Sequence, residues 1–145
     1  MFRTNFLFIL ILIMGISKTS IAQQTAARST DTSAFSIEDC INTLNSATIV
    51  NEKSGWHYFF TDKEKQDGWS IKMSCVNPGT YRHAAHKHAG DEIIFILEGK
   101  AEITIEGQSR VVGPNTSIYF PKGTLHGLKN AGSIALKYLV IKKDG

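Results

Sequence analysis

Two histidines and an acidic residue stand close together in the middle of the chain. His86 and His88 are two residues apart, and Glu92 follows four residues after His88. On an extended strand, a spacing of two turns both imidazoles toward the same face. Gly90 permits a turn that brings Glu92 back beside them. Neutral imidazoles with a nearby carboxylate form a suitable site for a divalent transition metal.

A second histidine-bearing segment follows later in the chain. Pro121 and Gly123 precede His126, directly after the apolar run 118–120. The proline ring fixes φ and the glycine supplies conformational freedom, so the pair predicts a rigid turn where a strand ends. We therefore expect His126 at a sharply defined position, where its imidazole joins the other ligands around one cation.

The spacing of the first segment resembles the first motif of the cupin superfamily. That motif runs Gly, five residues, His-x-His, three or four residues, Glu, six residues, Gly. The residues that keep this spacing are His86, His88, Glu92 and Gly99. Gly79 departs from it by one position, because six residues instead of five separate it from His86.

The second segment resembles the second cupin motif, which runs Gly, five residues, Pro-x-Gly, two residues, His, three residues, Asn. The residues that keep this spacing are Pro121, Gly123, His126 and Asn130. Asn115 takes the place of the leading glycine, and asparagine tolerates positive φ better than most residues. A gap of 21 residues separates Gly99 from Pro121, which is typical of a small cupin.

Together the motifs cover residues 70–142 and resemble a small single-domain cupin of type 2, a conserved-barrel protein. The resemblance implies an antiparallel jelly-roll β-barrel with one divalent metal ion inside it. The ligands that it implies are His86, His88, Glu92 and His126. Three neutral imidazoles and one carboxylate leave about +1 at such an ion and about two open positions in octahedral geometry. The donor set does not distinguish Fe, Mn, Ni, Zn, Co and Cu.

Two classes of function follow from such a site. The first is a metal-dependent enzyme, with a dioxygenase favoured over an isomerase or lyase, acting on a small polar or carbonyl- or enediol-bearing molecule. The alternative is a non-catalytic module that binds or senses a metal or a small ligand. Open coordination positions favour the enzyme, whereas the scarcity of general bases favours the binding module.

Several further side chains near the motifs are candidates for supporting roles. His83 is the candidate catalytic base or a hydrogen-bond partner of a ligand, although such a residue is more often exposed or packed. Tyr81, Asp91 and Tyr119 are candidates for orienting ligands or substrate. The aromatic cluster around His57 is expected in the core or an interface.

The elements that must position these residues are short strands. Stretches of apolar or alternating residues predict strands at 56–60, 69–75, 93–97, 101–106, 110–112, 116–120 and 135–141. In 69–75 the apolar residues alternate with Ser70, Lys72 and Ser74, the period of a half-buried strand. Ser36 is a good N-cap for a short helix whose apolar residues Ile37, Cys40, Ile41 and Leu44 share one face. The pattern predicts an all-β barrel or sandwich with one short N-terminal helix.

The N-terminus has the features of a secretory signal peptide over residues 1–22. Arg3 precedes an apolar run of nine residues, 6–14, and small residues precede a cleavage point between Ala22 and Gln23. This run is too short to span a bilayer. We expect a flexible leader at 23–34, a single cupin domain at 35–145, and a periplasmic or secreted protein without a membrane segment after cleavage.

Composition and the two cysteines limit the partners. Removing residues 1–22 takes away two basic side chains and leaves 14 basic and 13 acidic ones. Because no basic stripe is present, nucleic acid is excluded as a partner, and a small molecule is the expected ligand. Cys40 and Cys75 form a disulfide or remain thiols that behave as small buried hydrophobes. Exposed edge strands predict a homodimer.

Overall fold

The computed structural model describes residues 36–61, 63–64 and 66–143. The signal peptide expected at 1–22 and the leader expected at 23–34 lie outside these residues. Within the described part of the chain, no helix is long and apolar enough to cross a membrane.

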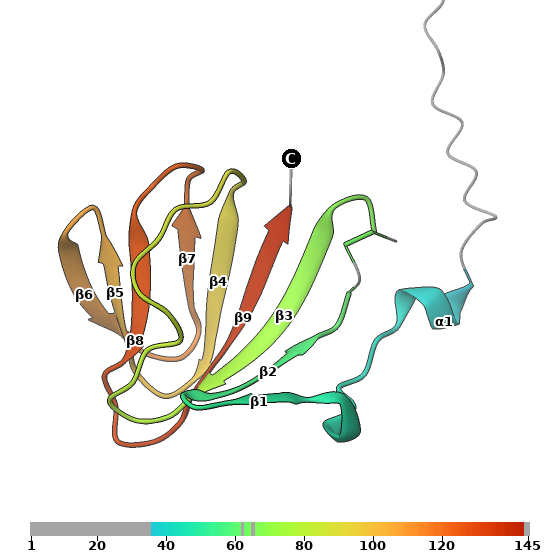
Figure 1. Cartoon of the computed structure of the whole chain (residues 1–145), viewed down its shortest axis with the longest axis horizontal. Coiled ribbons are helices and arrows are strands. Elements are labelled where there is room, and N and C mark those ends of the chain that lie inside the picture. Colours follow the sequence, from blue (N-terminus) through green and yellow to red (C-terminus); the bar gives the residue numbers. More distant parts are fainter. Residues whose placement is uncertain (1–35, 62, 65, 144–145) are drawn as a thin grey trace, which may run out of the picture. The chain divides into compact units, whose positions relative to one another are not determined.

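The described residues form nine strands in two antiparallel sheets (Figure 1). The strands are β1 Val50–Glu52, β2 Gly55–Phe59, β3 Trp69–Val76, β4 Glu92–Glu98, β5 Ala101–Ile105, β6 Gln108–Val112, β7 Thr116–Phe120, β8 His126–Asn130 and β9 Leu136–Lys143. The larger sheet has the order β1-β2-β3-β9-β4-β7, and the smaller has the order β6-β5-β8. The fold is all-β and of the jelly-roll type, which confirms the expected fold class.

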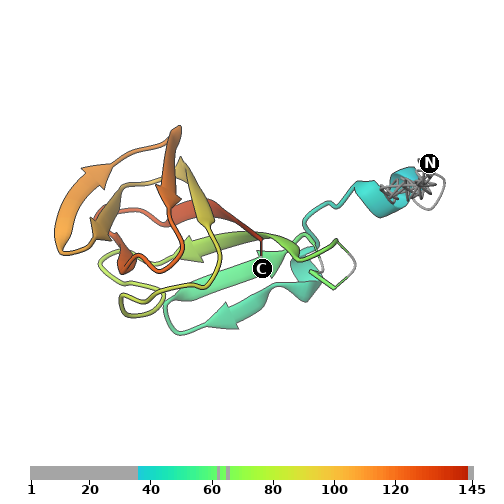
Figure 2. The same ribbon diagram turned by 90° about the horizontal axis from the view of Figure 1, so that it is seen from above.

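The strands of both sheets are curved (Figure 2). Inward-facing side chains of both sheets form one apolar core. Ile94 and Ile96 alternate with more exposed residues along β4, and Leu136, Tyr138 and Val140 do so along β9. This alternation places every second residue of a strand inside. Removing this apolar surface from water is the main force that holds the two sheets together.

Two strands were not predicted from the sequence. β1 has three exposed residues, and β8 has a sequence, HGLKN, with only one large apolar side chain. Neither stretch shows an apolar alternation, which is the signal from which a strand is predicted. Pairing with β2 in one case and with β5 in the other forms these strands.

The helix is shorter than the sequence pattern indicated. α1 spans Ile37–Cys40, and Ser36 caps it together with Asp39 in a capping box. The chain is extended from Ile41, and both Ile37 and Ile41 are exposed. The predicted helical face of Ile37, Cys40, Ile41 and Leu44 is therefore wrong, because only Ile37 and Cys40 lie in the helix. A single helical turn has too few hydrogen bonds to offset the cost of starting a helix, so without packing it does not extend.

Both cysteines are free thiols. Cys75 is buried in β3, whereas Cys40 is exposed on α1, so no disulfide joins them. Of the two alternatives, the disulfide is wrong, and only Cys75 behaves as a small buried hydrophobe. A disulfide requires Cβ atoms about 4 Å apart, a condition that spacing along the chain does not establish.

The Asn130 side chain connects the end of β8 to the larger sheet by hydrogen bonds. Its side-chain amide donates hydrogen bonds of 2.8 Å to the carbonyls of Val76 and Ile134, and its oxygen accepts one of 2.9 Å from Gly132. The residue is fully buried, so each of these bonds satisfies a group that water does not reach. This end of β8 is therefore fixed, and His126 lies at the other end.

The edge strands β1, β6 and β7 carry large exposed apolar side chains. Val50 is 48% exposed, Val111 56% and Tyr119 55%. Edge strands with such side chains are often covered by a partner subunit. The expected homodimer stays a prediction.

Tyr138 predicts a pH dependence of stability. Burial raises the pKa of Tyr138 to about 12 from an ordinary value of 10.0. Between these values the folded protein keeps a proton that the unfolded chain has released, so stability is complete below the unfolded pKa and falls as the pH rises. Between about pH 9 and about pH 11, the free energy of unfolding of the wild type should fall by about 1 kcal/mol more than that of Tyr138→Phe. Urea denaturation measures this, and parallel pH profiles would contradict it.

Candidate metal centre

The segment before His86 lies against β8 and brings two of the histidines together. His86 and His126 form a β-bridge, in which the His86 N–H donates to the His126 carbonyl at 2.9 Å and the reverse bond is 3.0 Å. Tyr81 forms a second bridge to Lys129 further along β8. Side chains directly opposite each other in such a pair lie on the same face. The backbone itself therefore places these two imidazoles side by side.

His88, just before β4, and Glu92, at its start, lie beside His86 and His126. The His88 carbonyl accepts a 2.8 Å hydrogen bond from the Gly123 N–H, which ties the loop before His126 to the first histidine segment. Gly123 has φ +77°, so a residue with a side chain would be strained there. Glu92 is the first residue of β4 and is buried on the same face as Ile94.

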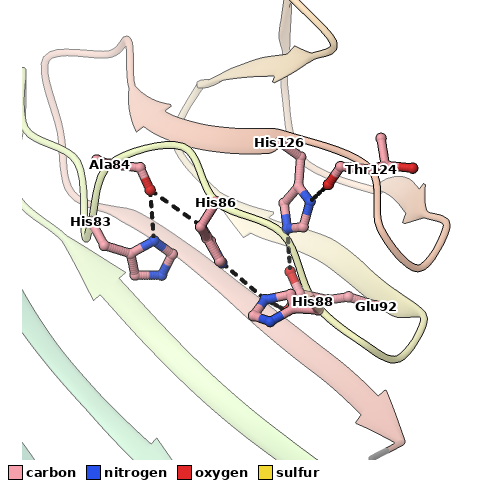
Figure 3. Close-up of polar contacts among 7 residues, drawn as sticks. All are labelled: His83, Ala84, His86, His88, Glu92, Thr124 and His126. Carbon is pink, nitrogen blue, oxygen red and sulfur yellow. Dashed lines mark hydrogen bonds and ion pairs between the residues drawn. The ribbon is translucent and has the colours of Figure 1, made fainter.

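The four predicted ligands point toward one another (Figure 3). Nitrogen atoms of His86, His88 and His126 lie within 4.8 Å of one another. The Glu92 carboxylate lies 3.1 Å from His88 Nε2 through one oxygen and 3.5 Å from His126 Nε2 through the other. The His126 and Glu92 side chains are only 3% and 9% exposed. The structure thus brings together all four residues from the two segments.

Backbone carbonyls fix the proton positions on two of these imidazoles. His126 Nδ1 lies 2.9 Å from the Thr124 carbonyl, and His86 Nδ1 lies 3.2 Å from the Ala84 carbonyl (Figure 3). A carbonyl oxygen only accepts, so each Nδ1 carries the hydrogen and each Nε2 presents its lone pair. This is the orientation that a metal-binding histidine needs.

The ligand atoms of these four residues do not satisfy one another by hydrogen bonds. His86 Nε2 lies 2.9 Å from His88 Nε2, and the His126 Nε2 faces a carboxylate oxygen. Within the described residues, His126 Nε2 is buried and has no hydrogen-bond partner. A buried acceptor without a donor is costly. A divalent ion shared by these atoms would satisfy all of them, so these residues fit a metal ion.

Comparison with known proteins identifies the family of this chain. Residues 72–142 match the family model described as Cupin domain. This chain belongs to the cupin superfamily. A solved structure described as a predicted oxalate decarboxylase from Thermotoga maritima has a TM-score of 0.61 at 19% identity, over 70% of this chain and 97% of that one. At that identity the likeness supports the cupin fold alone.

Two further proteins with different descriptions are similar to this chain. The polyketide cyclase RemF from Streptomyces resistomycificus has a TM-score of 0.58 at 22% identity, over 71% of this chain and 79% of that one. The mannose-1-phosphate guanylyltransferase of Escherichia coli (strain K12) is 33% identical over 76 residues. That match covers 52% of this chain and 16% of the transferase, so this chain spans about a sixth of the length of the mannose-1-phosphate guanylyltransferases that it matches.

Burial sets the charge of two histidines in the cupin site. Desolvation lowers the pKa of His88, and the opposing charge of Glu92 raises it less. Desolvation also lowers the pKa of His83, with the neighbouring His86 as the next cause. Both effects favour neutral imidazoles, the form that binds metal or accepts a proton.

His83 packs directly against one of the ligands, and the other three candidates lie around them. The His83 ring packs edge-on against His86 with centroids 4.1 Å apart, and the residue is exposed. Tyr81 is 58% exposed and, together with His83, lines an open pocket of about 250 Å³ over β5 and β8. Asp91 accepts a hydrogen bond of 2.9 Å from the Lys122 N–H. Tyr119 is exposed on the outer face of β7, where a hydrogen bond with Asp91 raises its pKa.

Sequence reasoning missed two kinds of residue near the centre. Phe120 stacks on the His126 ring with centroids 4.1 Å apart and an angle of 11°, which fixes the ring plane. Arg82 and Lys72 also lie near the ligands, since their charges act on one another and that of Glu92 acts on Lys72. The apolar strand end before Pro121 could have indicated that Phe120 packs near His126. No spacing rule indicates that Arg82 and Lys72 lie near the ligands.

Proposed function

We propose that this cupin is an exported metal-dependent enzyme in which His86, His88, Glu92 and His126 bind one divalent ion. The observation that carries the proposal is the close approach of the three imidazoles and the Glu92 carboxylate, with a buried His126 Nε2 that has no hydrogen-bond partner among the described residues. Four ligands leave about two of six positions open, as a catalytic site requires.

The proposed reaction is of oxygenase, isomerase or lyase type, with a dioxygenase favoured. The bound ion would supply a Lewis acid for a carbonyl or enediol oxygen of a small polar substrate. The Thr124 and Ala84 carbonyls hold two imidazoles in the required tautomer. His83 is the proposed base: its lowered pKa keeps it neutral near pH 7, and its exposed ring adjoins His86.

Export rests on the sequence of residues 1–22, which has the order of a signal peptide. Mass spectrometry of protein recovered from the periplasm or medium tests it. A mature N-terminus at Gln23 would support export, and an intact Met1 would contradict it.

Metal analysis of the purified protein, followed by turnover assays, tests the enzyme. We expect about one transition-metal ion per chain, and oxygen uptake with diketones, catechols or flavonoid-like enediols. Product analysis without oxygen covers isomerase and lyase reactions. His83→Gln should keep the metal and lose turnover. A wild type that binds metal but turns over none of these compounds would favour the alternative, a binding or sensing module, and a metal-free, inert wild type would refute both.

A further inference from the structure

A row of polar side chains crosses the inner face of the larger sheet, apart from the proposed metal ligands. His57 on β2 is paired with Ser74 on β3, and Ser74 is paired with Tyr138 on β9. Ser74 and Tyr138 are 0% and 4% exposed. Tyr138 alternates with half-buried neighbours along β9, and Ser74 is paired directly with it, so this row faces the interior.

Arg82 lies over the His57 end of this row. Its Nη2 donates a 2.6 Å hydrogen bond to His57 Nδ1 and also contacts the Glu52 carboxylate. Burial, followed by the charge of Arg82, lowers the pKa of His57, so its imidazole is neutral and accepts this bond. One side of the guanidinium is therefore held in place by two strands of the hairpin β1–β2.

The second terminal nitrogen of Arg82, Nη1, has no partner among the described residues. The Arg82 side chain is only 9% exposed, and its buried Nη1 makes no hydrogen bond there. Ser74 Oγ is also buried, with the Tyr138 side chain as its hydrogen-bonding neighbour. Buried polar atoms are almost always satisfied, so the Arg82 donor requires an explanation. An acceptor group that arrives with a ligand would supply it.

Lys72 adds a second positive charge to the same face. It lies two residues before Ser74 on β3, so both side chains point inward. Its Nζ is 5.7 Å from the Phe59 ring, and it forms no ion pair within the described part of the chain. Burial is the main cause that lowers the pKa of Lys72, the charge of Arg82 is the next, and that of Glu92 opposes them. Lys72 is therefore within electrostatic reach of both Arg82 and the proposed ligand Glu92.

We propose that Arg82, Ser74 and Lys72 form a carboxylate-binding site beside the metal centre, so that the substrate is a small molecule carrying a carboxylate. This inference rests on the proposed function, because the remaining substrate oxygens would face the ion. The unpartnered Nη1 of Arg82 and the ammonium group of Lys72 are charged donors of the kind that bind the two oxygens of a carboxylate. Arg82 and Lys72 carry two positive charges against one on Glu52, which leaves one to be neutralised by a single carboxylate.

Titration with malonate tests this site, because malonate is a small dicarboxylate that offers one carboxylate to the proposed ion and a second to Arg82. Calorimetry on zinc-loaded and on metal-free full chain should show malonate binding at least about tenfold tighter than neutral malonamide. Arg82→Gln should weaken malonate binding at least about tenfold and leave zinc content unchanged. Ser74→Ala should weaken it severalfold. The matched control is Arg110→Gln, because Arg110 is an exposed arginine on β6.

The outcomes separate this inference from the proposed function. A zinc-loaded wild type whose malonate affinity is the same in Arg82→Gln and Ser74→Ala would overturn the carboxylate site and leave the metal centre intact. Equal binding of malonamide, or tighter binding of inorganic phosphate, would also overturn it. A wild type that takes up no zinc but binds malonate through Arg82 would overturn the metal centre alone. If Arg82→Gln does not fold, malonate binding by Ser74→Ala tests the carboxylate site instead. This substitution removes only one oxygen atom, so the variant is expected to fold.

Discussion

Replacing His126 by alanine is expected to lower the affinity of the protein for zinc(II) at least about 100-fold. Removal of a residue that only supports a metal ligand typically costs about 10- to 100-fold in affinity, so removal of a ligand costs at least as much. His126 is also the most buried of the four, and its Nε2 has no other partner within the described residues. Competition with a chromophoric chelator measures the change.

His83→Ala is the matched control for this experiment. It removes the same imidazole from a position next to His86 but outside the proposed ligand set, so zinc affinity should stay within about threefold of wild type. Because His126 packs on Phe120, His88→Ala provides a second variant at a more exposed ligand, with 23% of its side chain accessible. Wild-type zinc affinity in folded His126→Ala and His88→Ala would refute the metal centre.

The metal centre was predictable because its geometry is encoded locally. A spacing of two places His86 and His88 on one face, and the turn at Gly123 fixes the start of β8. What sequence could not show is the register of the pairing between His86 and His126, which brings the two segments together. The spacing that resembles the cupin motifs supplied that information, since it belongs to a known fold.

The carboxylate-binding group was not predictable, because an alternating pattern does not say which face is inside. In β3 the alternation favours the apolar set, including Trp69 and Cys75, as the half-buried face. The structure buries Ser74 completely and turns Lys72 inward, while on the apolar face Trp69 is 45% exposed and only Cys75 is buried. Polar residues that line a binding site reverse the usual relation between hydrophobicity and burial, so composition places them on the wrong face.

Exchanging Gly55 for alanine is expected to lower the free energy of unfolding by about 4 kcal/mol. Gly55 opens β2 with φ +140°, and a Cβ there would lie 1.9 Å from the Cys75 carbonyl oxygen and 2.9 Å from its carbon. Both atoms are backbone in the middle of the larger sheet, so they do not move without breaking the pairing of β2 with β3. Strain at such φ costs about 1–3 kcal/mol, and overpacking adds about as much.

Gly107→Ala separates the two causes. Gly107 has φ +80° in the hairpin between β5 and β6, and nothing lies within 4 Å of the position that an alanine methyl group would take, so only the strain of about 1 kcal/mol remains. Urea denaturation of both variants measures the difference, and equal losses would show that the contact with Cys75 is relieved cheaply. Because Gly55 belongs to the hairpin that holds Arg82 through Glu52 and His57, folded Gly55→Ala should also bind malonate more weakly while it keeps its zinc. A loss of zinc instead would show that this hairpin supports the metal ligands as well.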